Sequence, residues 1–127
     1  MSPELDKALC EKFPQIFADR NGSMTVTAMC WGFEVNDGWY SLIDVLCEEM
    51  QRDTDQQGAL QVVATQVKEK HGGLSFYVHA ASDRQMAMID FAEALSYRTC
   101  EQCGAPGSLD EREGRWMTTL CPQHRDA

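Results

Sequence analysis

The last 28 residues hold the feature that most constrains how this chain can fold, two pairs of soft metal ligands. Two residues separate Cys100 from Cys103 and two separate Cys121 from His124, with 17 residues between the pairs. Three thiolates and one imidazole complete the tetrahedral shell that zinc prefers and leave no position open for water. The spacing therefore predicts one structural Zn²⁺ per chain that keeps the C-terminal end folded.

The residues around these ligands predict the shape of the metal-binding segment. Gly104 follows the second cysteine, where a tight turn favours positive φ. Two short β-prone segments flank a charged tip at residues 110–114, and Pro122 suits the first turn of a terminal helix. The pattern predicts a treble-clef or ribbon-like zinc finger over residues 99–127, packed on an α+β domain formed by residues 1–98.

Other chemistry for the same cysteines fits the sequence less well. A covalent haem site needs histidine directly after the second cysteine, and Gly104 stands there. A thioredoxin-type dithiol leaves Cys121 and His124 unexplained. A catalytic zinc site keeps one ligand position open. Structural zinc is therefore favoured over a redox or iron site and over four unrelated residues.

The net charge of −9 is unevenly distributed along the chain. Residues 1–57 hold 11 acidic and four basic side chains, a net charge of −7. A nucleic-acid-binding surface needs the opposite sign, so direct binding to DNA or RNA is not expected. An acidic surface either aids solubility or docks on a basic protein. The candidate partner-binding residues are Glu48, Glu49, Asp53 and Asp55.

The sequence gives no indication of a membrane or secretory segment. No apolar run approaches the roughly 18–20 residues of a spanning helix. The N-terminus has no basic region followed by an apolar stretch, which a secretory signal would show. We therefore expect a cytoplasmic protein whose six cysteines bind metal or pack in the core, since disulfides are rare in a reducing compartment.

Apolar spacing and turn residues predict three helices. The first begins after Ser2 and ends near Lys12, before Pro14. The second covers about residues 38–52, followed by a polar loop at 53–58. The third covers about residues 82–97 and is expected to bury four apolar side chains: Met88, Phe91, Ala92 and Leu95.

Strands are predicted from β-prone composition. Residues 24–35 are rich in Val, Thr, Trp and Phe and indicate one strand. Residues 60–70 fit either a helix or a strand. A strand is favoured because Gly72-Gly73 and the β-prone run 74–78 complete a hairpin. The resulting fold class is α+β: three helices, a small antiparallel sheet and the C-terminal finger.

No arrangement in the sequence indicates an enzyme. A nucleophile–base pair would have to come from Cys47, His71 or His79, whose proximity a sequence does not reveal. Cys10, Cys30 and Cys47 are expected to be packed thiols. Trp31, Trp39 and Trp116 are expected to be core anchors, with an exposed binding patch as the alternative.

Several stretches together resemble a family of small, largely uncharacterised phage, prophage and bacterial proteins. They are Asp37-Gly38-Trp39-Tyr40 with Leu42-Ile43, 66–70 with 72–74 and 76–77, 96–107, and Trp116, 119–121 and His124. The resemblance covers roughly residues 37–124. It implies an accessory protein of a phage or mobile element and no defined activity.

Two functions follow as hypotheses. The first is an acidic zinc-binding protein that binds another protein and inhibits a host defence complex, for example of the CRISPR type, by occupying its basic nucleic-acid channel. The alternative is a zinc-finger nucleic-acid-binding or transcriptional regulator. The finger's basic residues for that role are Arg98, Arg112, Arg115 and Arg125.

Overall fold

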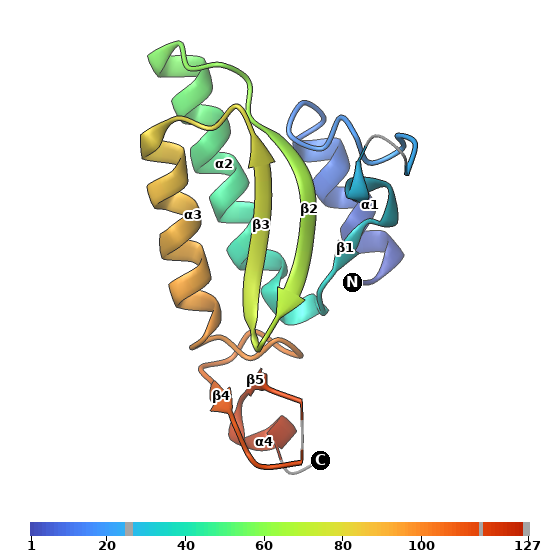
Figure 1. Ribbon diagram of the computed structural model, residues 1–127, viewed down its shortest axis with the longest axis vertical. Helices are drawn as coiled ribbons and strands as arrows, with labels where there is room; N and C mark the ends of the chain where they lie inside the picture. The colour runs from blue at the N-terminus through green and yellow to red at the C-terminus, as the bar shows by residue number, and fades with distance from the viewer. Residues whose placement is uncertain (25–26, 115, 126–127) are drawn as a thin grey trace.

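The computed structural model describes residues 1–24, 27–114 and 116–125, arranged as an α+β layer with a small finger at one end (Figure 1). The helices are α1 (Pro3–Lys12), α2 (Tyr40–Gln57), α3 (Asp83–Ser96) and α4 (Pro122–Arg125), with 3₁₀ turns η1 (Ala28–Trp31) and η2 (Asp37–Trp39). The strands are β1 (Phe33–Glu34), β2 (Val63–Lys70), β3 (Gly73–His79), β4 (Ser108–Asp110) and β5 (Thr118–Leu120). The predicted α+β class is confirmed.

The main sheet is mixed, whereas the sequence suggested an antiparallel one. Its strand order is β1-β2-β3, with β2 antiparallel to β3 and β1 parallel to β2. The parallel pair is short, with Phe33 opposite Val67. The chain between the two strands contains α2, which is the long crossover that a parallel connection requires. β4 and β5 form a separate antiparallel pair in the finger.

The β2–β3 hairpin confirms the strand interpretation of residues 63–70. Lys70 pairs with Gly73, which leaves His71 and Gly72 as a two-residue turn. Both have positive φ, 53° and 89°, as a type I′ turn requires. The turn points toward the finger, so the hairpin carries a tight loop to the metal-binding end (Figure 1).

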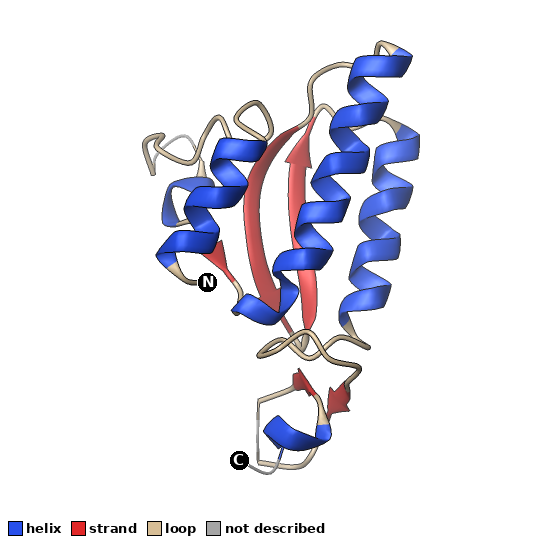
Figure 2. Cartoon of the chain, turned by 180° about the vertical axis from the view of Figure 1, so that it is seen from behind, coloured by secondary structure: helices blue, strands red, loops and turns tan. Residues whose placement is uncertain are grey.

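Helices α2 and α3 lie side by side over one face of the sheet, with α1 beside them (Figure 2). The largest buried side chains come from both layers and include Trp39, Ile43, Met50, Val67 and Leu74. Gln85 also lies fully buried between the two helices. Its side-chain amide donates to the Met50 carbonyl and the Thr54 hydroxyl, at 2.9 and 2.8 Å. This satisfied polar group fixes α3 against α2.

Residues 24–35 do not form the predicted strand. The Thr27 hydroxyl accepts a hydrogen bond from the Met29 amide and starts the 3₁₀ turn η1. Gly32, with φ of 78°, then reverses the chain, and only Phe33–Glu34 pair with β2. Residues 25 and 26 of the predicted strand lie outside the described residues. Side-chain capping and a positive-φ glycine thus override β propensity here.

Helix α2 is longer than predicted. It includes residues 53–57 of the predicted loop and ends at Gly58, whose φ of 70° makes the left-handed cap. Asp53 therefore lies on a helix, where its buried carboxylate accepts a hydrogen bond from the Ser82 hydroxyl at 3.2 Å. Its other oxygen is 3.5 Å from Arg84 Nε. Asp53 is part of the α2–α3 contact.

The predicted burial of α3 is half right. Ala92 is buried and Met88 packs against the core, but Phe91 and Leu95 are 70% and 43% exposed. Similarly, Trp39 is fully buried, whereas Trp31 and Trp116 are exposed. Four large apolar side chains that were expected in the core, Phe91, Leu95, Trp31 and Trp116, therefore lie on the surface.

Candidate metal centre

The four predicted ligands come together in one cluster. The Sγ atoms of Cys100, Cys103 and Cys121 and a ring nitrogen of His124 all lie within 4.8 Å of one another. Cys103 Sγ is 3.8 Å from Cys121 Sγ, and His124 Nδ1 is 3.6 Å from Cys100 Sγ and 3.2 Å from Cys121 Sγ. The cluster is able to hold a metal ion, with His124 facing it through Nδ1.

Two of these three separations fit tetrahedral coordination, and the third, from Cys121 Sγ to His124 Nδ1 at 3.2 Å, is shorter. Zinc–sulfur bonds of about 2.3 Å and zinc–nitrogen bonds of about 2.0 Å place tetrahedral S···S pairs about 3.8 Å and S···N pairs about 3.5 Å apart. The Cys103–Cys121 and Cys100–His124 distances match these values. A tetrahedral metal ion bound by all four side chains would have no vacant position for a substrate or water.

The local electrostatics favour thiolates at two of the three cysteines. At Cys100, burial opposes ionisation, but the backbone amides of Cys121, Cys103 and Gln102 and the His124 ring outweigh it and lower its pKa to about 6. At Cys121, burial is likewise outweighed by the His124 amide and ring, which lower the pKa. The same two sulfurs raise the pKa of His124.

Short local hydrogen bonds shape the first ligand pair. The Gly104 amide donates to the Cys100 carbonyl at 2.8 Å, and the Cys100 amide donates to the Ala105 carbonyl at 2.8 Å. Gly104 has φ of 82°, as expected for the residue after the second cysteine. The second pair begins α4, where the His124 amide donates to the Cys121 carbonyl. Knuckle, hairpin and helical turn follow one another in the predicted order.

The first ligand pair packs against Gly38 of η2, the turn that directly precedes α2. The Gly38 amide donates to the Glu101 carbonyl at 2.7 Å, and the Trp39 indole donates to the Thr99 carbonyl at 2.9 Å. A Cβ atom on Gly38 would lie 2.2 Å from the Cys100 carbonyl oxygen, so only glycine fits. Glu101, between the two cysteines, accepts from the Asn36 amide at 3.0 Å. Burial raises the pKa of Glu101, and that hydrogen bond partly offsets the effect.

A second contact joins the finger to the hairpin turn. The buried Thr119 hydroxyl donates to the Gly72 carbonyl at 2.6 Å. A Cβ on Gly72 would lie 2.3 Å from the Leu109 methyl, and one on Gly73 would lie 2.3 Å from the Tyr97 ring. The finger is thus held by the α2 start and the β2–β3 turn, in addition to the chain connection from α3.

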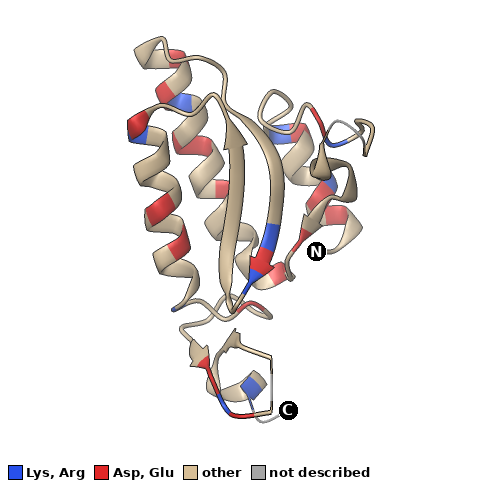
Figure 3. Ribbon diagram, in the orientation of Figure 1, with Lys and Arg blue, Asp and Glu red and all other residues tan. Residues whose placement is uncertain are grey.

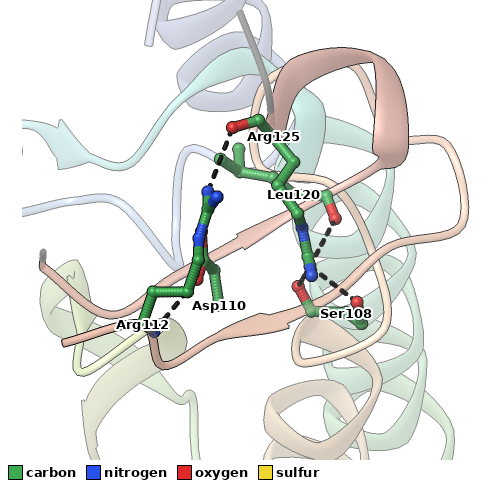
Figure 4. A network of polar contacts seen from close by, with 5 residues as sticks. All are labelled: Ser108, Asp110, Arg112, Leu120 and Arg125. Carbon is green, nitrogen blue, oxygen red and sulfur yellow. Dashed lines mark hydrogen bonds and ion pairs between the residues drawn. The ribbon is translucent and has the colours of Figure 1, made fainter.

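Two arginines of the finger are used within the finger itself. Arg112 pairs with Asp110 at 2.7 Å, and Arg125 donates to the Ser108 and Leu120 carbonyls (Figure 4). Arg112 lowers the pKa of Asp110 to about 2. Arg98 is exposed, and Arg115 lies outside the described residues. Two of the four cations suggested for nucleic-acid binding, Arg112 and Arg125, therefore hold the β4–β5 hairpin to the terminal turn.

The candidate partner-binding acids divide into two groups. Glu48 and Asp55 are exposed on α2 and Glu49 is half-buried there, and Figure 3 shows acidic positions recurring along α2 and α3 with few basic ones. Arg52 pairs with both Glu48 and Glu49, at 3.6 and 2.7 Å. Asp53 is buried, so its inclusion in an exposed acidic surface was wrong.

Cys47, His71 and His79 are not brought together. Cys47 lies inside the core, where burial raises the pKa of its thiol well above the usual range. His71 is in the hairpin turn and His79 is at the far end of β3, a separation of about 20 Å at the rise of a strand. These residues do not form the nucleophile–base pair that was considered.

Sequence reasoning identified the ligands but missed the residues that seat them, Gly38 and Glu101. Their signal lay in the resemblance: Asp37-Gly38-Trp39, the Gly72-Gly73 pair and 96–107 are distant in sequence and meet at the metal centre.

Comparisons of the chain with protein-family models, curated protein sequences and solved structures found no match. Within the described ranges, no helix has both the length and the apolar character needed to cross a membrane. Fold and site together define an α+β protein with a C-terminal Cys₃His cluster.

Proposed function

We propose that this protein is a small zinc-stabilised module that binds another protein through its acidic α2 surface. The zinc ion supplies structure here, since Cys100, Cys103, Cys121 and His124 fill its shell and keep the finger folded against Gly38. In the phage or mobile-element setting that the resemblance implies, the partner is a basic nucleic-acid-binding complex of a host defence system.

The observation that carries this proposal is the charge of α2. Its 18 residues contain five acids and one base, Arg52. Asp44 is paired with Lys12 at 2.6 Å and Asp53 is buried, which leaves Glu48, Glu49 and Asp55 as the outward carboxylates. A surface of this sign attracts the cationic channel of a nucleic-acid-binding protein and competes with phosphate for it.

The test is affinity capture from host lysate with zinc-loaded protein, comparing wild type with the E48Q/E49Q/D55N variant. The matched control, D90N/E93Q/E113Q, removes the same charge from exposed positions outside α2. We expect the α2 variant to lose the captured protein, the control to retain it, and a DNA or RNA oligonucleotide to displace it from wild type. Equal capture by wild type and the α2 variant would contradict the proposal.

A further inference from the structure

An apolar groove runs between α2 and α3 on the side facing away from the sheet. It has a volume of about 920 Å³ and is lined mainly by aliphatic and aromatic side chains, including Leu42, Val45, Met88, Phe91 and Leu95. Val45 and Phe91 are 56% and 70% exposed. The knuckle residues Cys103 and Gly104 also line it, so the groove begins at the metal centre.

The groove has the dimensions of a helix-binding site. Its α3 wall extends from Arg84 to Leu95, about 16 Å at the helical rise of 1.5 Å per residue. That length accommodates three turns of a partner helix, whose apolar side chains at i, i+3 or i+4, and i+7 would enter the space between α2 and α3. Met86 lies on α3 but not in the groove, although it is also exposed.

Charge determines which kind of helix fits. The charged residues lining the groove are Asp37, Glu49 and Arg84, and Arg84 lies beside the buried Asp53 carboxylate. Arg52, next to the groove, is shared between Glu48 and Glu49. The nearby cations are thus engaged by this chain's own acids. A second copy of a chain with net charge −9 would be repelled, whereas a cationic helix would be attracted.

We propose that the α2–α3 groove binds an amphipathic helix of the partner protein, with an apolar stripe in the groove and Lys or Arg side chains along its flanks. The proposal rests on the proposed function and specifies the part of the basic partner that is recognised. Asp37, within η2, and Glu49, ten residues beyond the end of η2, supply carboxylates toward the two ends of the groove for the flanking cations.

A synthetic probe tests the groove without knowledge of the partner. The probe is a fluorescein-labelled peptide of about 14 residues with leucines at helical spacing and lysines on the flanks, measured by fluorescence anisotropy. Two control peptides are measured beside it. The first keeps the amino-acid composition of the probe but has its leucine positions scrambled. The second keeps the leucine stripe but has glutamate in place of lysine. We expect binding of the probe and loss of binding for both controls.

Three single variants map the site at which the probe binds the protein. Val45→Gln and Phe91→Gln change exposed groove residues, and Met86→Gln changes an exposed apolar residue of α3 outside the groove. Glutamine is a good helix former, so all three proteins should fold, which unchanged melting temperatures would confirm. We expect affinity to fall about tenfold or more for the groove variants and about twofold or less for Met86→Gln. Equal losses at all three positions would overturn the proposal.

Sedimentation and capture separate the remaining outcomes. Wild type should sediment as a monomer; a dimer that Phe91→Gln dissociates would show that a second copy occupies the groove and overturn the proposal. In the lysate experiment, capture that Val45→Gln and Phe91→Gln leave unchanged but E48Q/E49Q/D55N abolishes would refute the groove while the proposed function stands. Loss of capture by the groove variants and also by E48Q/E49Q/D55N supports both the groove and the proposed function.

Discussion

Gly38 provides the sharpest structural test, because a single methyl group there must separate the finger from α2. In Gly38→Ala the added Cβ would lie 2.2 Å from the Cys100 carbonyl oxygen and 2.5 Å from the Glu101 carbonyl carbon. Both are backbone atoms, so rotation of a side chain cannot relieve the clash. The shift also weakens the Gly38–Glu101 hydrogen bond of 2.7 Å.

The cost combines overpacking of about 1–3 kcal/mol with a hydrogen bond of about 1 kcal/mol, roughly 2–4 kcal/mol together. For a domain of this size that corresponds to a fall in Tm of about 8–16 °C. The control is Gly58→Ala, because Gly58 has positive φ but no atom within 4 Å of its Cβ position. Its cost should be about 1 kcal/mol, or roughly 4 °C.

The assay is thermal denaturation of the zinc-loaded proteins, followed by circular dichroism at a helical wavelength. Gly38→Ala should melt well below Gly58→Ala, because only the former separates the finger from the core. If the two variants melt at the same temperature, or if Gly38→Ala equals wild type, the docking described for the finger is wrong.

Three further predictions concern the metal ligands and the contact between α2 and α3. Cys121→Ser should abolish stable metal binding and speed amide hydrogen exchange in residues 99–125, while the amides of the β2–β3 hairpin stay protected. Equally fast exchange in the finger and in the hairpin would show that the metal supports the whole fold. Metal affinity should rise from about pH 6 to about pH 9, because Cys103 and His124, whose pKa values are raised, hold protons that the metal must displace, whereas the thiolate of Cys100 persists down to its pKa of about 6. Competition with a chromophoric chelator measures the affinity at each pH, and an affinity that does not change with pH would argue against these ligands. Gln85→Ala should lower the free energy of unfolding by about 1–3 kcal/mol, because the Met50 carbonyl and the Thr54 hydroxyl lose their buried donor. Urea denaturation measures this free energy, and a change near zero would show that the Gln85 amide does not hold α3 to α2.

The parts of the fold that local sequence determines were predicted well. The four ligands lie in two short motifs whose spacing alone brings each pair together. The turn at His71 and Gly72 likewise needs only two residues with positive φ, which glycine supplies and the I′ geometry imposes on histidine. The predicted start of the third helix at about residue 82 agrees with α3, where the structure shows a capping box of Ser82 and Gln85 that the prediction did not use.

The parts that were missed depend on distant residues. Asp53 looked like a surface acid, and its burial follows from Ser82 and Arg84 on another helix. Phe91 has the spacing of a core residue, yet a pattern cannot tell whether the surface that covers it belongs to the same chain. The role of Gly38 is equally invisible locally, since it arises from a backbone 62 residues away.

We expect Cys100, Cys103, Cys121 and His124 to form a closed, structural metal site. Native mass spectrometry combined with zinc-edge X-ray absorption of the purified protein tests it most directly. We expect one zinc per chain with three sulfur ligands and one nitrogen ligand at about 2.3 and 2.0 Å. A finger, residues 99–125, that stays folded without metal, or a zinc shell containing an oxygen ligand from water, would contradict this assignment.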